Sequence, residues 1–167
     1  MNKLQNPIKI RNIAIIVMIA IFFILDRLLK NLALSQVPNS AINIFGRFFS
    51  FQFTANPYIA FSLPLYGHLL NALILIIIGL LIYYIFYLIL NKKSQKLTAL
   101  LLTIILFGAI SNILDRLLYG YVIDYLELRH FTVFNLADVM ISLGALTLLF
   151  HYLKGGSFDK DCQTNIK

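Results

Sequence analysis

Charged residues and cysteine are scarce in this chain, and each scarcity excludes a class of protein. Only 13% of the residues are charged, against about 25% in an ordinary soluble domain, which argues against a soluble globule. The single cysteine, Cys162, lies in a polar segment near the C-terminus. The chain therefore has no disulfide framework.

Residue groupings typical of metal sites and nucleophilic hydrolases are also missing from the sequence. His68, His130 and His151 are scattered and no H-E-x-x-H motif is present, so we expect no metal and no cofactor. No Ser or Cys stands in a recognisable nucleophile motif. The net charge is +7, but the basic residues form no stripe with interleaved aromatics, so we expect no nucleic-acid partner.

Hydrophobic sequence is what the chain has in abundance, at 60% of its residues. A bilayer core of about 30 Å is crossed by a helix of about 20 apolar residues. Four stretches qualify, at 12–34, 69–90, 97–116 and 134–153. Basic residues precede the first stretch, separate the second from the third and follow the fourth. Because cytoplasmic loops are enriched in Lys and Arg, we predict an all-α membrane protein with four transmembrane helices and both termini cytoplasmic.

Two segments outside these stretches have the character of strands. Between residues 48 and 54, phenylalanine alternates with polar residues, and residues 121–133 are rich in β-branched and aromatic side chains. A period of two is typical of a half-buried strand. We therefore predict a small extracytoplasmic β element at the membrane surface, within a single integral-membrane domain covering residues 1–167.

Four of the seven acidic residues are predicted to lie at one depth, near the outer membrane surface. Asp26 and Asp115 fall at the outer ends of the first and third predicted helices, Asp138 lies just inside the fourth, and Asp124 is in the loop before it. An ionisable residue inside a membrane is a functional candidate by default. Two carboxylates held close share a proton, and such a pair can activate water while protonating a carbonyl oxygen. The pattern is thus suited to peptide hydrolysis without a covalent intermediate.

Other interpretations of these acids remain open. Asp26 and Lys30, at i and i+4, suit a structural ion pair, and Asp115 could pair with Arg116 or Arg27 in the same way. A carrier or channel subunit would also use intramembrane acids, to relay protons, although a conduction path should place them at successive depths. A structural membrane adaptor would leave the charge within the fourth apolar stretch unexplained.

Four short motifs occur in an order shared with a known family. The stretch "SNILDRLLYGYVIDY" resembles a G-N-x-x-D-R-x-x-x-G-x-V-x-D-F block, and "FNLADVMISLG" resembles an F-N-x-A-D block. Earlier in the chain, "DRLLK" resembles D-x-x-x-K, and "NPYIAFS" resembles N-x-G-x-A-F. These are motifs of the lipoprotein signal peptidases (signal peptidase II), and together they extend over nearly the whole chain.

The resemblance implies a multi-pass aspartic endopeptidase of the bacterial plasma (inner) membrane, with its active site near the extracytoplasmic face. Its substrate would be a prolipoprotein, cut immediately before a diacylglyceryl-modified cysteine. Membrane lipid would be its other partner, globomycin its inhibitor, and we expect a monomer. By position, Asp124 and Asp138 would form the catalytic dyad. Supporting or substrate-binding roles would fall to the remaining motif residues: Asn56, Asn112, Asp115, Arg116, Asn135, Asp26 and Lys30.

Four residues depart from the family pattern. Tyr58 stands at the glycine of N-x-G-x-A-F, and Tyr125 stands at the phenylalanine that ends the V-x-D-F block. The family's G-G-x-x-G-N reads "FGAISN" here, with Phe107 and Ser111 in place of glycines. Glycine allows a backbone to approach a ligand or a neighbouring helix closely. The replacements therefore predict a change in the shape of the groove that would bind the substrate, while both candidate catalytic acids are retained.

Overall fold

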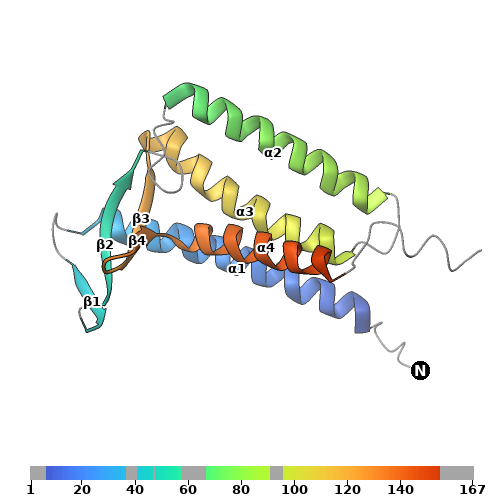
Figure 1. The fold of residues 1–167 in the computed structure, drawn as a ribbon, viewed down its shortest axis with the longest axis horizontal. Coiled ribbons are helices and arrows are strands. Elements are labelled where there is room, and N and C mark those ends of the chain that lie inside the picture. The colour runs from blue at the N-terminus through green and yellow to red at the C-terminus, as the bar shows by residue number, and fades with distance from the viewer. Residues whose placement is uncertain (1–6, 37–40, 47, 58–66, 91–95, 155–167) are drawn as a thin grey trace, which may run out of the picture.

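A layer of helices with a small sheet at one end makes up the fold (Figure 1). The computed structural model describes residues 7–36, 41–46, 48–57, 67–90 and 96–154. Within these residues the helices are α1 (Pro7–Leu34), α2 (Gly67–Leu90), α3 (Lys96–Tyr119) and α4 (Leu136–Leu153). The predicted helices are thus present, although α1 begins before residue 12 and α3 continues past residue 116. The predicted start of the fourth helix at residue 134 is wrong, because Phe134 ends a strand and α4 begins after the cap at Asn135.

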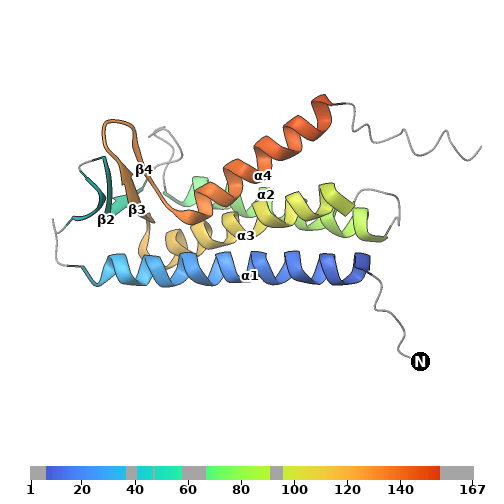
Figure 2. The ribbon, with the colours of Figure 1, turned by 90° about the horizontal axis from the view of Figure 1, so that it is seen from below.

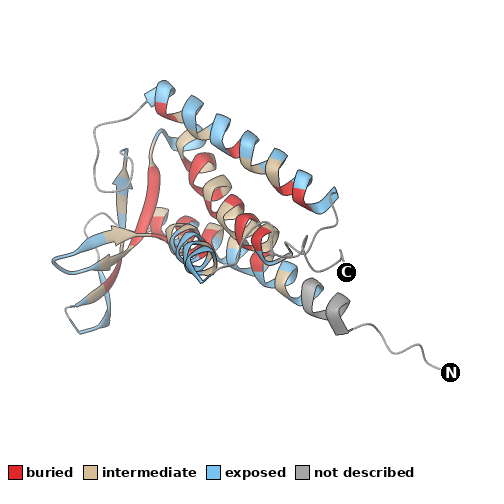
Figure 3. Cartoon of the chain, turned by 45° about the vertical axis from the view of Figure 1, so that its right-hand side comes forward, coloured by how far each residue is buried: buried red, intermediate tan, exposed pale blue. Residues whose placement is uncertain are grey.

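Helix α3 is central to the helical layer, because it contacts α1, α2 and α4. Apolar side chains such as Ile78 and Ile85 of α2 and Leu106 of α3 are buried between the helices. Figure 3 shows buried positions along α3 and exposed positions along the outer side of α2. The exposed positions include many large hydrophobic residues, which suits a surface covered by lipid.

Two glycines allow α3 and α4 to pack closely. A Cβ added to Gly108 would lie 2.7 Å from the carbonyl oxygen of Ala137 and 2.8 Å from Cγ1 of Ile141. A Cβ added to Gly144 would lie 2.7 Å from Cγ1 of Ile105. All three distances are too short for a real contact, so a larger residue at either position would push the helices apart. Gly108 thereby fixes the distance between α3 and the first turn of α4.

Three helices in the described part of the chain are long and apolar enough to cross a membrane. They are α2, α3 from Leu97 onward and α4, with mean hydropathy of 2.9, 2.3 and 1.7. The second half of α1 carries Asp26, Arg27 and Lys30. That α1 also crosses the membrane, as the sequence suggests, stays a prediction.

The sheet is antiparallel throughout, in the order β1-β2-β3-β4. Its strands are β1 (Ile42–Phe45), β2 (Phe49–Asn56), β3 (Val122–Leu128) and β4 (Thr132–Phe134). The two predicted β segments correspond to β2 and to the hairpin of β3 and β4. Strand β1 was not predicted, because its four residues are all exposed and carry no clear alternation.

The register of β2 on β3 places two predicted site residues on one face of the sheet. Asn56 lies opposite Val122 and Thr54 lies opposite Asp124, so the side chain of Asn56 is a diagonal neighbour of Asp124. The chain turns from α3 into β3 at Gly120, whose φ of 84° is a conformation that glycine adopts without strain.

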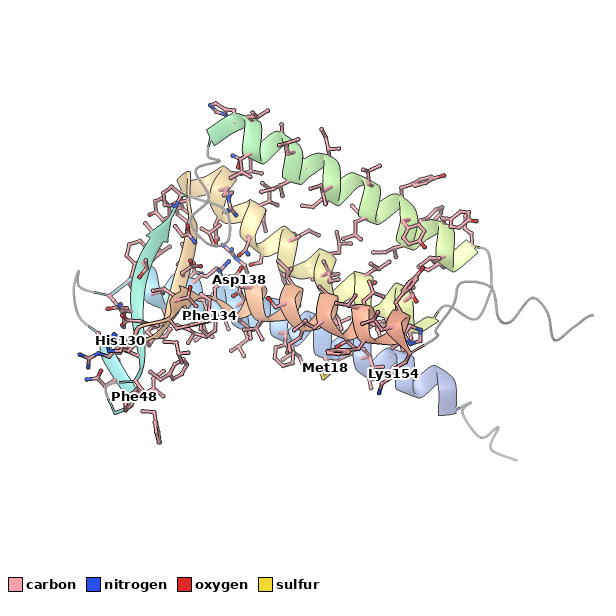
Figure 4. The ribbon with its side chains drawn as sticks, viewed as in Figure 1. Met18, Phe48, His130, Phe134, Asp138 and Lys154 are labelled. Carbon is pink, nitrogen blue, oxygen red and sulfur yellow. The ribbon has the colours of Figure 1, made fainter. Side chains whose placement is uncertain are left out.

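The sheet lies at one end of the helices, and α1 begins and α4 ends at the other (Figures 1 and 2). Seen from below, α4 starts near the sheet and diverges from α1 towards its C-terminal end (Figure 2). Asp138 is at the sheet end of α4 and Lys154 at the far end (Figure 4). Asp138 therefore lies at the end of the helical layer that meets the sheet.

Candidate active site

Asp124 and Asp138 are joined through one residue, Asn135. Asp124 lies within β3 and is 2% exposed, while Asp138 is the third residue of α4. The side-chain amide of Asn135 donates to Oδ1 of Asp124 at 2.7 Å, and its backbone N–H donates to Oδ2 of Asp138 at 3.2 Å. Asn135 therefore links the two acids directly, through its side chain on one and its backbone on the other.

Asn135 takes this position because it caps α4. Its side-chain oxygen accepts the backbone N–H of Asp138 at 2.9 Å, so the two residues form a reciprocal capping box. A cap of this kind satisfies two backbone N–H groups that a helix leaves without intrahelical partners. The same contacts that begin the helix thus hold Asp138 at its first turn.

Each acid also accepts a hydrogen bond from a second asparagine. Asn56 of β2 donates to Oδ2 of Asp124 at 2.9 Å, and Asn112 of α3 donates to Oδ1 of Asp138 at 2.7 Å. The side-chain oxygen of Asn112 in turn accepts from Asn135 at 3.2 Å. An amide can orient a carboxylate without exchanging its proton, because it does not titrate. The three asparagines therefore constrain the acids and leave acid–base chemistry to them.

The Asp124 carboxyl differs from a freely solvated group in its protonation. Burial, reinforced by the negative charge of Asp138, raises the pKa of Asp124 from 3.8 to about 7. Hydrogen bonds from Asn56 and Asn135 and the charge of Lys30 oppose that rise. Near neutral pH a large share of Asp124 is consequently protonated, which is what a proton-sharing pair requires.

A buried ion-pair cluster lies behind the two acids. Lys30 of α1 lies with its Nζ 3.2 Å from Oδ2 of Asp26 and 2.6 Å from Oδ2 of Asp115, and all three side chains are 0% exposed. Arg27 also pairs with Asp115. Asp26 and Lys30 thus form the ion pair that their i, i+4 spacing suggested, and Asp115 pairs with Arg27, one of the two partners considered. Buried charges are tolerated when they are paired and hydrogen-bonded.

The cluster connects to the candidate dyad and to the sheet. Lys30 donates to the side-chain oxygen of Asn112 at 2.9 Å, and Asn112 donates to Asp138. Oδ2 of Asp115 accepts the backbone N–H of Ile123 at 3.2 Å, which ties α3 to β3. Arg116 lies within electrostatic range of Asp138, Asp124 and Asp115. All nine site residues predicted from the sequence are therefore assembled at one end of the fold.

Two hydroxyl groups in this region were not identified as site residues from the sequence. Tyr125 donates to Oδ1 of Asp26 at 2.9 Å, and Ser111 donates to Oδ2 at 2.5 Å. Burial and the charge of Asp26 raise the pKa of the Tyr125 phenol above its ordinary value, so the hydroxyl remains a donor. The available signal was that two hydroxyl-bearing residues replace non-polar ones within the motifs.

Phe107 and Tyr58 are the other two residues that differ from the family pattern. Phe107 packs edge-on against Phe23 of α1, with ring centroids 5.6 Å apart, so it contributes to the contact between α1 and α3. Tyr58 lies outside the described residues.

Among the described residues, no group of three or more His, Cys, Asp or Glu side chains is arranged to hold a metal ion.

Comparison with known sequences reveals clear relatives. Residues 18–154 match the family model described as Signal peptidase (SPase) II. A lipoprotein signal peptidase of Clostridium tetani (strain Massachusetts / E88) is 33% identical over 150 residues, which cover 86% of this chain and 95% of that protein. A lipoprotein signal peptidase of Caldicellulosiruptor bescii is 36% identical over 134 residues, which cover 80% and 87%.

The fold also matches solved structures. One, described as a bacterial membrane enzyme, has a TM-score of 0.73 at 21% identity, covering 88% of this chain and 92% of that one. A second with the same description has a TM-score of 0.70 at 20% identity, covering 85% and 94%. The shared fold and the apolar helices indicate a multi-pass membrane protein.

Proposed function

The chain belongs to the signal peptidase II family, and we propose that it is an aspartic endopeptidase that cleaves prolipoproteins immediately before the diacylglyceryl-modified cysteine. The observation that carries the proposal is the convergence of Asp124 and Asp138 around Asn135. Both acids can act on the same peptide bond, because the asparagines that orient them lie in neighbouring elements at the same end of the fold.

The proposed mechanism assigns different roles to the two acids. Asp138 lies in the first turn of α4, where the helix dipole favours a negative charge, so it acts as the general base. It takes a proton from a water molecule, whose oxygen attacks the carbonyl carbon of the scissile bond. Asp124, with a pKa of about 7, donates its proton to the carbonyl oxygen. The product of this step is a tetrahedral diol.

Collapse of the diol returns both acids to their starting states. Asp124 takes back a proton from one hydroxyl as the C–N bond breaks, and Asp138 gives its proton to the departing nitrogen. Asn56, Asn112 and Asn135, which donate to these carboxyls, hold them throughout, because a carboxyl oxygen can accept a hydrogen bond in either protonation state. The water is consumed and the enzyme is regenerated, so the step needs no cofactor.

The competing proton-relay function is less consistent with the geometry. A conduction path needs acids at successive depths. Asp26, Asp115 and Asp138 are instead linked by short contacts through Lys30 and Asn112. Acids gathered in one network suit local chemistry better than transport across the membrane.

For topology, we propose four transmembrane helices, α1 included, with both termini in the cytoplasm of a bacterial cell and the sheet on the outer side. Residues 1–167 would then form one peptidase domain, active as a monomer among membrane lipids and inhibited by globomycin. Single cysteines introduced at Ser94 and Ser40 in a Cys162→Ser background test this arrangement. Membrane-impermeant labelling from outside should modify position 40 and spare position 94. Labelling of both from the same side would refute the four-helix topology.

Cleavage of a defined precursor tests the function itself. Purified protein in detergent or nanodiscs should release the signal peptide from a diacylglyceryl-modified precursor, and mass spectrometry should place the cut before the modified cysteine. A precursor without the lipid modification is the matched substrate control and should be cut far more slowly. Failure to cleave the modified precursor, in protein shown to be folded by circular dichroism, would refute the proposal.

A further inference from the structure

The first turn of α4 is held by its own N-cap and by side chains from two other elements. The first N–H groups of a helix have no intrahelical acceptor. In α4, the N–H of Leu136 donates to the Tyr125 hydroxyl at 3.0 Å, and the N–H of Ala137 donates to Oδ1 of Asp26 at 3.1 Å. The third, that of Asp138, donates to its own N-cap. Two of the three acceptors therefore come from outside the helix, from β3 and from α1.

Asp26 is the centre of this arrangement. Its Oδ1 accepts from Tyr125 and from the backbone of Ala137, and its Oδ2 accepts from Ser111 at 2.5 Å and lies 3.2 Å from the Lys30 ammonium. Each oxygen thus has two donors, which is the full capacity of a carboxylate. We call Asp26, Ser111 and Tyr125 the α4 clamp.

We infer that Tyr125, supported by Ser111 through Asp26, is a positioning residue that fixes Asp138 relative to Asp124 for catalysis. The inference rests on the proposed function. Phenylalanine at position 125 and glycine at position 111, the residues of the family pattern, would provide neither hydroxyl. The clamp is therefore a feature of this chain and is not implied by its motifs.

The position of Tyr125 in β3 explains why it can set the distance between the acids. It directly follows Asp124, and both residues attach to the start of α4, Asp124 through Asn135 and Tyr125 through the N–H of Leu136. Tyr125 is 0% exposed and packs on Phe51, with ring centroids 5.5 Å apart. A buried, doubly hydrogen-bonded phenol has little freedom, so the strand and the helix cannot shift independently.

Loss of the hydroxyl should affect turnover more than binding. Tyr125→Phe keeps the ring but removes the acceptor of the Leu136 N–H and one donor to Asp26. Catalysis is sensitive to displacements below 1 Å, so kcat should fall about tenfold while KM stays within about twofold. Tyr121→Phe is the matched control, since Tyr121 is a half-buried tyrosine next to the same strand with ring contacts to Tyr119 and Phe53. Its kinetics should equal wild type.

Hydrogen exchange gives a readout independent of activity. In Tyr125→Phe, backbone amides of residues 136–138 should exchange faster than in wild type, while those of α2 should be unchanged. If Tyr125→Phe does not fold, Ser111→Ala serves as the second variant, with a smaller fall in kcat and the same constant KM. Should Tyr125→Phe lose only thermal stability and keep its kcat, the residue is structural and the inference is wrong.

The two proposals fail in different ways. A wild-type protein that does not cleave the lipid-modified precursor refutes the proposed function, and a catalytic role for the clamp falls with it. Cleavage by wild type together with an unchanged kcat in folded Tyr125→Phe, or in Ser111→Ala if Tyr125→Phe does not fold, refutes the positioning role alone. A fall in kcat at constant KM, with faster exchange confined to the start of α4, supports it.

Discussion

Replacement of Lys30 by methionine should strongly destabilise the protein. The lysine is 0% exposed and its ammonium contacts the carboxylates of Asp26 and Asp115 and the side chain of Asn112. Methionine fills much of the same volume without the charge, so two buried carboxylates lose a shared counterion. Removal of one partner from a buried ion pair costs about 3–5 kcal/mol. For a chain of this size that corresponds to a melting temperature lower by about 6–20 °C.

Thermal unfolding in detergent, followed by circular dichroism at the helical minimum, measures this effect. Lys154→Met is the matched control, because that lysine is exposed at the C-terminal end of α4. Its melting temperature should stay within about 2 °C of wild type, as is usual for surface substitutions. An equally small change for Lys30→Met would refute the structural role of the buried cluster. Activity lost without any loss of stability would instead place Lys30 in contact with substrate.

Two further perturbations probe protonation and helix packing. The pKa of Asp124, raised to about 7, predicts that kcat/KM falls about tenfold per pH unit above pH 7, because the proton donor is lost. The same shift predicts that folding stability falls as pH rises from about 4 to about 7, by at most about 4 kcal/mol. Asp124→Asn should make this dependence on pH weaker, and identical stability profiles for the variant and wild type would contradict the prediction. Gly108→Ala would place a Cβ 2.7 Å from the carbonyl oxygen of Ala137. It should lower the free energy of unfolding by about 1–3 kcal/mol and reduce activity. Gly79→Ala is the control, because no atom lies within 4 Å of an added Cβ there. It should leave activity unchanged and raise the free energy of unfolding by about 0.5–1 kcal/mol. Equal effects of the two substitutions would refute the close packing of α3 on α4.

The helices, and the gathering of Asp26, Asp115, Asp124 and Asp138 at one end of them, could be predicted because both follow from local sequence. Apolar runs of sufficient length define helices wherever lipid replaces water. Asp138 stood out because a charge within an apolar run needs compensation. Asn135 and Asp138 are three residues apart, so the sequence places them on one face of a helix, whereas the capping box between them is a finding of the structure.

The hydroxyl contacts could not be predicted, because they depend on packing between distant segments. Ser111 and Tyr125 looked like losses of glycine and phenylalanine from the family pattern. In the fold, α1 brings Asp26 between them, 85 and 99 residues away along the chain. Similarly, the replacement of glycine by Phe107 suggested that two backbones could no longer approach closely, whereas the phenylalanine packs on Phe23 of α1. The strand β1 is short and exposed, so no periodic pattern marked it.

The most direct measurement of the central claim is the cleavage rate of Asp124→Asn and Asp138→Asn on the lipid-modified precursor. Asparagine matches aspartate in shape but cannot accept and return a proton, so each variant should fold and lose turnover by at least about 10²–10⁴-fold. Glu127→Gln is the control, because Glu127 accepts its hydrogen bond from Ser50 at 2.7 Å and contacts neither acid through any described hydrogen bond. It should cleave at the wild-type rate. Near wild-type cleavage by either asparagine variant would contradict the assignment of Asp124 and Asp138 as the catalytic pair.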